Sequence, residues 1–353
     1  MTLASKVLLL LLAGVLTQTP TVYIAARQFE IGKDARLRGV SAVSDTVAWA
    51  SGAKGTIART KDGGKSWDLL PVTVSVPDGE ALDFRDIDAI DANTAYALSI
   101  GPGEASRIFK TADAGQTWTL QYTNHDPKAF FDAMTFSDAN HGVVMSDSVD
   151  GQFVIMLTSD GGKPAVATRF QFLPPALPNE GAFAASGTNI AVVGSTHIWI
   201  GTGAASKARV LRSTDGGRSW KVSDTPIASG ASSGIFSIAF RDPMHGVIVG
   251  GDYKKESEAV DNVAFTSDGG VTWTLAREHG LSGFRSAVAW QGRLWFAVGP
   301  SGTDMSTDDG HTWSPSGKSE GLHTFAFSRQ GKSGWGAGEH GRVVRFDGLD
   351  AIH

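Results

Sequence analysis

Three arginines, Arg38, Arg85 and Arg285, each stand near the start of an apolar segment whose polarity alternates. Alternation with a period of two is typical of β-strands. Aligning seven such segments by their alternation gives this set of equivalent residues: Arg38, Arg85, Asp132, Gly181, Phe236, Arg285 and His323. A guanidinium group binds a carboxylate or phosphate through two parallel hydrogen bonds. If the segments surround a common axis, the set predicts a mostly positive ring at the mouth of a channel, able to hold an anionic group.

The same residues have a second interpretation. The arginines could pair with nearby carboxylates such as Asp83, Asp86 and Asp132 and simply fill the channel. Structural ion pairs shift the pKa values of charged groups just as ligand sites do, so a cluster of arginines is compatible with either role. The sequence leaves both interpretations open.

The elements that must position these residues are indicated by a repeat. Six times, a Ser or Thr is followed two residues later by Asp and four residues later by Gly, and five copies continue to a Ser or Thr and a Trp. The repeated residues are Asp62 with Trp67, Asp113 with Trp118, Asp160 without a Trp, Asp215 with Trp220, Asp268 with Trp273, and Asp308 with Trp313.

Each copy has the composition of a tight turn. The Asp can accept hydrogen bonds from amides just ahead, the Gly tolerates positive φ, and the Trp begins the next strand. The copies recur every 40 to 55 residues, a period typical of stacked units that cannot bury a core alone. We therefore interpret the repeat as scaffold, with each Trp as a buried peg.

The motif is the Asp-box, or BNR repeat, of β-propellers. With the surrounding pattern Leu37-Arg38-Gly39-Val40 and Gly55-Thr56-Ile57-Ala58-Arg59-Thr60, the chain resembles the photosystem II stability/assembly factor family, and more closely its relatives in non-photosynthetic bacteria. The resemblance covers roughly residues 36 to 346. It implies an all-β, seven-bladed propeller that acts as a binding or assembly factor, and in that family a positive patch on one face is associated with partner binding.

We expect residues 27–353 to form one propeller domain, with blades at about 36–71, 84–122, 130–168, 181–223, 234–276, 283–315 and 321–346. The last blade has only three strands of its own. The alternating segment Gln28-Phe29-Glu30-Ile31 should supply the fourth by pairing with Arg342 to Phe346, because closure removes exposed sheet edges.

The third box is degenerate, with Pro164 and Ala165 in the places of Ser/Thr and Trp. We expect an irregular outer strand in that blade.

The boxes and the ring should lie on opposite faces. In a four-stranded antiparallel blade, the first and third turns share one face, whereas the second turn and the links between blades share the other. The boxes are third turns. The longer connections, such as Gln171 to Glu180 and Gly251 to Asn262, lie on the ring's face, and elaborated loops on a regular scaffold commonly carry binding sites.

Residues 1–26 have the pattern of an export signal, with Lys6, an apolar run from Val7 to Leu16, and the pair Ala25-Ala26. The run is short for a bilayer span, so a cleaved signal is favoured over an N-terminal anchor, and we expect no other membrane span. With no cysteine, a disulfide framework and thiol chemistry are excluded. We expect an exported protein, periplasmic or secreted, and a monomer.

Other function classes find little support. A net charge of −5 with interspersed signs argues against nucleic-acid binding. The nine histidines show no metal-ligand spacing, and no metal or cofactor is expected.

An enzyme remains the alternative. Sialidases use three arginines for a sugar carboxylate, together with a Tyr nucleophile and acidic residues. The chain lacks their Arg-Ile-Pro signature and has Leu37-Arg38-Gly39 there. Tyr253 with Glu256 or Glu258 is the only pairing that fits. The sequence thus favours a non-catalytic factor that binds an anionic or carboxylate-bearing segment of a protein partner, with sialidase-like hydrolysis on the same face as the alternative.

Overall fold

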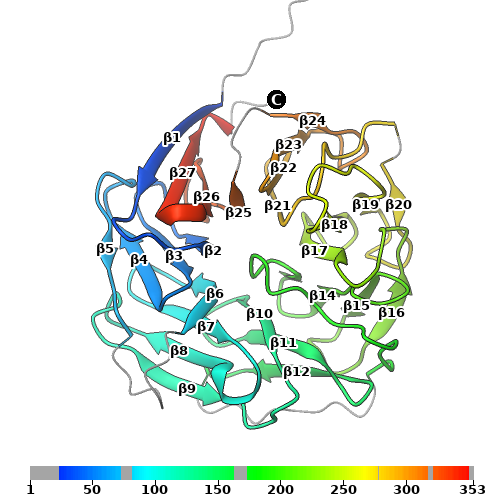
Figure 1. Ribbon diagram of the computed structural model, residues 1–353, viewed down its shortest axis with the longest axis horizontal. Helices are drawn as coiled ribbons and strands as arrows, with labels where there is room; N and C mark the ends of the chain where they lie inside the picture. Colours follow the sequence, from blue (N-terminus) through cyan, green and yellow to red (C-terminus); the bar gives the residue numbers. More distant parts are fainter. Residues whose placement is uncertain (1–23, 73–81, 163–172, 277, 317–320, 350–353) are drawn as a thin grey trace, which may run out of the picture.

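The computed structural model describes residues 24–72, 82–162, 173–276, 278–316 and 321–349. Seven antiparallel sheets stand around a central axis (Figure 1). Within the described ranges there is no α-helix, only two short 3-10 turns, η2 (Gly103–Ala105) and η3 (Glu339–Gly341). No described helix could therefore cross a bilayer. The predicted seven-bladed β-propeller is confirmed.

The first three blades follow one another along the chain. Blade 1 has β2 (Leu37–Ala42), β3 (Ala48–Gly52), β4 (Thr56–Thr60) and β5 (Asp68–Leu69). Blade 2 has β6 (Asp83–Ala89), β7 (Ala95–Ile100), β8 (Arg107–Thr111) and β9 (Thr119–Thr123). Blade 3 has β10 (Phe131–Phe136), β11 (Gly142–Val149) and β12 (Gln152–Thr158).

The remaining blades complete the ring. Blade 4 has β13 (Ile190–Val193), β14 (His197–Gly201), β15 (Arg209–Ser213) and β16 (Lys221–Asp224). Blade 5 has β17 (Ser233–Phe240), β18 (Gly246–Asp252), β19 (Val263–Thr266) and β20 (Thr274–Leu275). Blade 6 has β21 (Ala287–Gln291), β22 (Leu294–Gly299), β23 (Gly302–Ser306) and β24 (Ser314–Pro315). Blade 7 has β25 (Leu322–Phe327), β26 (Gly334–Gly338) and β27 (Arg342–Asp347), with β1 (Ala25–Glu30) outermost.

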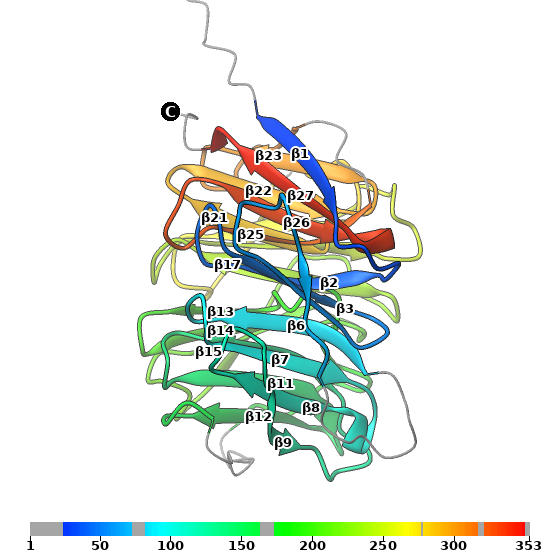
Figure 2. The same ribbon diagram turned by 90° about the vertical axis from the view of Figure 1, so that its left-hand side faces the viewer.

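The N-terminal strand closes the ring as predicted. β1 pairs antiparallel with β27, with Gln28 opposite Val344 and Glu30 opposite Arg342. The two strands lie side by side in Figure 2. The pairing begins at Ala25, two residues earlier than the expected domain boundary. The predicted signal at residues 1–26 lies almost wholly outside the described residues and stays a prediction.

The Asp box is a network of local hydrogen bonds. In blade 1, the Thr60 hydroxyl donates to Asp62 at 2.9 Å and accepts from the amide of Gly64 at 2.9 Å. Asp62 then accepts from the amide and the hydroxyl of Ser66, at 2.9 and 2.6 Å. The other intact boxes repeat this pattern. A motif that satisfies its own polar groups can be used in every blade, because it requires no partner from elsewhere.

The broken third box keeps part of this network. The Thr158 hydroxyl still donates to Asp160 at 3.0 Å and accepts from Gly162 at 2.9 Å. Pro164, Ala165 and the expected irregular outer strand lie outside the described residues.

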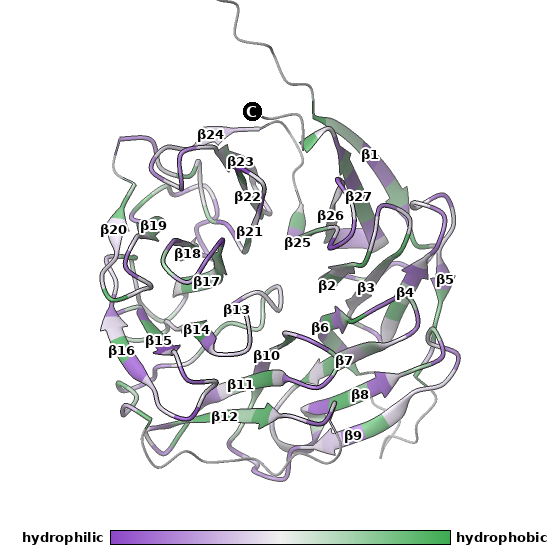
Figure 3. Cartoon of the chain, turned by 180° about the vertical axis from the view of Figure 1, so that it is seen from behind, coloured by the Kyte–Doolittle hydropathy of each residue, from purple (hydrophilic) through white to green (hydrophobic). Residues whose placement is uncertain are grey.

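The core is distributed between neighbouring blades. Seven main apolar clusters each join residues of two adjacent blades, including the cluster of blades 7 and 1 that contains Leu37, Trp335 and Val343. The Trp of a box packs on the preceding blade, as in the edge contact of Trp118 with Trp49, 6.3 Å between ring centroids. Seen from behind, hydrophobic colour follows the strands, and much of the connecting chain is hydrophilic (Figure 3). The Trp pegs are therefore part of the inter-blade core.

Blade 4 begins later than predicted. Its inner strand starts at Ile190, not at Gly181. Gly181 instead forms an isolated bridge with Gly203, and residues 182–189, here called the crossing segment, enter the middle of the ring. The alternation around Gly181 was wrongly assigned to a strand, because a chain segment buried inside a channel is also partly apolar.

Candidate functional site

Five of the predicted ring residues share one local geometry. Each is the extra residue of a β-bulge on the inner strand of its blade. The bulges lie between Leu37 and Gly39, Phe84 and Asp86, Phe131 and Ala133, Ile235 and Ser237, and Leu322 and Thr324, so the extra residues are Arg38, Arg85, Asp132, Phe236 and His323. A bulge leaves one residue out of the ladder and redirects its side chain.

These five side chains line one cavity of about 520 Å³ at the channel mouth. We call it the mouth pocket. The other lining residues are Arg36, Ile100, Phe130, Asp147, Ala182, Phe183, Ala184, Ala185, Tyr253, Glu256, Phe284, Pro300 and Glu339. Several of them lie in second-turn loops, which places the pocket on the predicted face. The cavity falls in the size range of small-ligand sites.

The Asp boxes lie on the opposite face. Five of the six boxes donate a backbone hydrogen bond to the first turn of their own blade, as in the bonds from Gly63 to Thr46 at 3.0 Å and from Gly269 to Met244 at 2.9 Å. The boxes thus set the register of the blades without contributing to the pocket.

Arg285 is not at the channel mouth, which corrects its predicted position. Its strand β21 begins only at Ala287, and its side chain is fully buried against Asp304, with Nε 2.7 Å from the carboxylate. It also donates to Ser282 at 2.6 Å. Phe284 lines the pocket in its place. A fully buried arginine requires a paired carboxylate, and Arg285 has one inside its own blade.

The crossing segment forms the floor of the mouth pocket. Arg38 donates to the Ala185 carbonyl at 3.3 Å, and Arg85 donates to the Ala184 carbonyl at 2.8 Å. On the other side, the Ser186 hydroxyl donates to the Ser286 carbonyl at 2.7 Å, and the Ile238 amide donates to the Thr188 carbonyl at 2.9 Å. The segment is therefore tied to several blades. The channel is filled mainly by this segment. Of the ion pairs predicted to fill it, the pair of Arg85 with Asp83 is present.

The cationic wall of the pocket consists of Arg36, Arg38 and Arg85. Arg36 is paired with Glu339 at 2.7 Å, and Arg85 with Asp83 at 2.9 Å. Arg38 differs: it makes no ion pair with a described carboxylate, and its buried Nε has no hydrogen-bond partner there. Burial, with the charges of Arg85 and Arg36, lowers the pKa of Arg38 to about 10. Glu339 and Asp83 lie close enough to offset part of this effect, but Arg38 is a partly buried cation that forms no ion pair among the described residues.

His323 lies beside this wall. Its Nε2 is 2.7 Å from Glu339 Oε1, the same oxygen that contacts Arg36. Burial and the charge of Arg38 lower the pKa of His323 to about 4, so the imidazole is neutral at pH 7. Glu339 therefore contacts both Arg36 and His323, and Arg38 is the arginine of this wall that forms no ion pair among the described residues.

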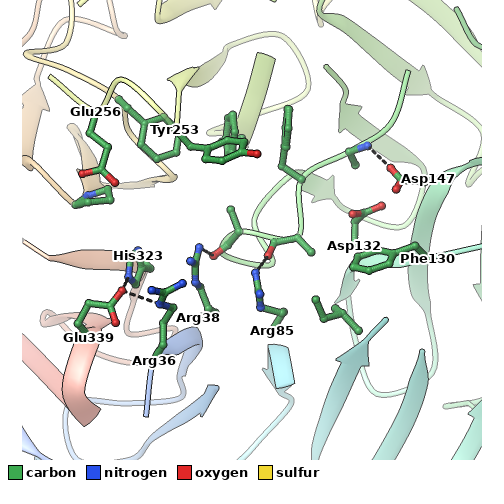
Figure 4. Close-up of a pocket in the computed structure, with 18 residues that line it drawn as sticks. Arg36, Arg38, Arg85, Phe130, Asp132, Asp147, Tyr253, Glu256, His323 and Glu339 are labelled. Atoms are coloured by element: carbon green, nitrogen blue, oxygen red, sulfur yellow. Dashed lines mark hydrogen bonds and ion pairs between the residues drawn. The ribbon is translucent and has the colours of Figure 1, made fainter. Parts of the chain in front are cut away.

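The acidic wall consists of Asp132 and Asp147, from the adjacent strands β10 and β11 (Figure 4). Asp132 is only 1% exposed, and its Oδ2 has no hydrogen-bond partner in the described chain. Burial and the charge of Asp147 raise the pKa of Asp132 well above its ordinary value. Burial also raises the pKa of Asp147 to about 6. Two carboxyl groups here favour sharing a proton or meeting a cation.

The third wall is aromatic. Phe183 of the crossing segment stacks on Phe236, with ring centroids 4.0 Å apart. Tyr253 meets both rings edge-on, at 6.3 and 6.1 Å, and is itself 43% exposed. Phe284 meets Phe236 at 4.6 Å. Such a surface can contact an apolar or aromatic group of a ligand.

Several pocket residues were missed by sequence reasoning: Arg36, Asp147, Phe183 and Glu339. Arg36 could have been found, because it stands two residues before Arg38 and so shares its side of the chain. Phe183 could not, because it reaches the pocket through a long irregular segment. Asp147 and Glu339 lie where second strands end, and no local pattern distinguishes them from surface residues.

Within the described ranges, no three or more His, Asp or Glu side chains lie together in a group that could hold a metal ion. His141 and His245 contact Asp138 and Asp242 of their own turns at 2.9 Å. Tyr253 and Glu256, the pairing considered for hydrolysis, do line the mouth pocket.

Comparison with known proteins shows the fold and no more. No family model matches the chain, and no curated protein matches its sequence. A structure of YCF48 bound to a D1 peptide is 17% identical, with 91% of this chain and 96% of that chain covered and a TM-score of 0.64. YCF48 from Cyanidioschyzon merolae is also 17% identical, with coverage of 92% and 99% and a TM-score of 0.61.

An enzyme is equally similar in shape. Virginiamycin B lyase from Staphylococcus aureus is 15% identical, with 92% of this chain and 99% of that chain covered and a TM-score of 0.65. At such identities a shared propeller is compatible with unrelated functions. The chain is a seven-bladed propeller, a fold that occurs in binding proteins and in enzymes, so the fold alone does not determine its function.

Proposed function

We propose that this protein is a non-catalytic binding or assembly factor whose mouth pocket holds a carboxylate-bearing segment of a protein partner. The observation that carries the proposal is Arg38, a partly buried guanidinium with an unpartnered Nε and no ion pair with a described carboxylate. A partly buried cation of this kind is stabilised by a hydrogen-bonded anion. The likeness to YCF48, one structure of which holds a D1 peptide, supports a peptide-binding role.

We also propose that the chain is exported, to the periplasm or beyond. The support is the sequence pattern of residues 1–26, with Lys6 before an apolar run. N-terminal sequencing of the mature protein tests this, with cleavage near Ala26 expected. A mature chain beginning at Met1 in the cytoplasmic fraction would reject export.

The binding role is tested by replacing Arg38 and Arg85 with Gln and capturing partners from a periplasmic extract. The matched control is Arg218→Gln, an exposed arginine in the fourth Asp box on the opposite face. We expect the captured partner to be lost with the double variant and kept with the control. Because both arginines also bond the crossing segment, circular dichroism must show that the double variant is folded. An identical partner list for all three proteins would reject this pocket.

Sialidase-like hydrolysis is the second candidate, because Tyr253 and Glu256 share the pocket with three arginines. A tyrosine nucleophile requires a hydrogen-bonded acidic partner, and among the described contacts none joins the Tyr253 hydroxyl to a carboxylate. Binding is therefore favoured. Turnover of a fluorogenic sialoside that disappears in Tyr253→Phe would reverse this order.

A further inference from the structure

The buried carboxylate of Asp132 is unexplained by a site that only binds anions. Asp132 is the extra residue of the β10 bulge, lines the mouth pocket and is 1% exposed, yet its Oδ2 has no partner in the described chain. A buried carboxyl oxygen without a hydrogen bond is costly. Such an atom in a cavity wall indicates that a hydrogen-bond donor belongs next to it.

Asp147 strengthens this indication. Its Oδ1 accepts from the amide of Ala182 at 3.0 Å, which holds the carboxyl group in place at the junction of β11 and the crossing segment. Neither Asp132 nor Asp147 forms an ion pair with a described Lys, Arg or His, although Arg85 lines the same cavity. The two carboxyl groups together can accept hydrogen bonds from one cationic group.

The acidic and cationic walls lie at different sides of one cavity. In Figure 4, Asp132 and Asp147 lie beside Phe130, the three arginines lie below, and Tyr253 lies across the opening from them. Arg36 and Arg85 are each paired with a carboxylate of their own, so Arg38 is the net positive charge. The pocket is therefore dipolar, with an aromatic surface joining its two charged walls.

We infer that the mouth pocket binds a dipolar peptide segment whose carboxylate contacts Arg38 and whose ammonium group contacts Asp132 and Asp147. The apolar middle of the segment rests on Phe183, Phe236 and Tyr253. This inference rests on the proposed function for the carboxylate and adds the ammonium group. A ligand that carries both charged groups interacts with both walls. It should therefore bind more tightly than a ligand that carries only one of them.

The test uses one tripeptide, Gly-Phe-Gly, in four forms: with free ends, N-acetylated, C-amidated, and capped at both ends. Binding to the intact protein is measured by calorimetry. We expect the free form to bind tightest at pH 7, and we expect each cap to weaken binding about tenfold or more. Amidation removes the anion that meets Arg38, and N-acetylation removes the cation that meets Asp132 and Asp147. The doubly capped form should bind weakest.

The variants assign each end to its wall. In Asp132→Asn and in Asp147→Asn, tested separately, we expect the penalty of N-acetylation to shrink while the penalty of amidation remains. Asn has the same shape as Asp, and its Oδ1 can still accept the hydrogen bond from the Ala182 amide. Asp147→Asn therefore provides the test if Asp132→Asn fails to fold. Arg38→Gln should abolish the penalty of amidation only. Asp150→Asn, an exposed carboxylate paired with Lys128, is the matched control and should change neither.

The outcomes separate this inference from the proposed function. If amidation weakens binding and N-acetylation does not, the dipolar inference is wrong and the carboxylate site stands. If Glu256→Gln removes the N-acetylation penalty and the aspartate variants do not, the ammonium site is wrongly assigned. If no form binds, or amidation has no effect, both proposals are rejected.

Discussion

Arg38 donates a hydrogen bond of 3.3 Å to the carbonyl of Ala185, which is 147 residues away in the sequence. Arg85 makes the equivalent bond to Ala184 at 2.8 Å. The crossing segment is thus held by the same side chains that form the cationic wall. Binding and the integrity of the channel are therefore coupled through two guanidinium groups.

The crossing segment is sensitive to Gly187. This residue has φ +71°, and a Cβ there would lie 2.3 Å from the Asp86 carboxyl group. Gly187→Ala should therefore destabilise the protein well beyond Gly194→Ala, a control glycine with φ +63° and nothing within 4 Å of its added Cβ. The control should cost about 1 kcal/mol, from the left-handed backbone alone. Chemical denaturation measures both, and equal losses would contradict the packing described for Gly187.

Ring closure depends on β1. Deleting residues 27–33 removes most of the strand that pairs with β27 and exposes an edge of blade 7. We expect a marked fall in the melting temperature by calorimetry. Glu30→Gln, an exposed change on the same strand, should leave the melting temperature unchanged. A deletion that melts like the full chain would show that closure does not need β1.

The Trp pegs hold neighbouring blades together. Trp118 is 6% exposed and packs on Trp49 of blade 1. Trp118→Ala should lower the free energy of unfolding by about 3 to 5 kcal/mol. Leu120→Ala on the next strand, where the side chain is 39% exposed, should cost far less. If urea denaturation showed similar losses in the free energy of unfolding for both variants, Trp118 would not be a main contributor to the interface between the blades.

Asp147 should make stability depend on pH. Burial raises its pKa in the folded protein to about 6, above an unfolded value of about 3.9. The folded state binds the proton more tightly, so this contribution to stability is present at low pH and is lost as the pH rises through 6. The free energy of unfolding of the natural protein, minus that of Asp147→Asn, should therefore fall between about pH 4 and pH 6.

The free energy of unfolding must be compared between the natural protein and Asp147→Asn, because His323 also titrates in this pH range. Its effect on stability has the opposite pH dependence. Burial lowers its pKa to about 4, so its contribution is lost as the pH falls. A difference that stays flat from pH 4 to pH 7, measured by denaturation at each pH, would contradict a raised pKa at Asp147.

The sequence by itself determined the architecture of this protein, because the signals involved are local. The box bonds, such as those joining Thr60, Asp62 and Gly64, span two to four residues, and six copies reveal the blade period. The alternation of Gln28 to Ile31 identified the closing strand. Alternation also located Arg38, Arg85, Asp132, Phe236 and His323, since a bulge occupies the same place on each of these inner strands.

Only the tertiary structure decided what those residues do. Arg285 and Arg38 have similar local sequences, but Arg285 meets Asp304 inside its blade, whereas Arg38 meets a carbonyl from across the channel. Which of them keeps a free charge depends on contacts between distant residues. The crossing segment, and the unpartnered oxygen of Asp132, likewise arise only when the ring closes, because closure brings distant groups together and excludes water from between them.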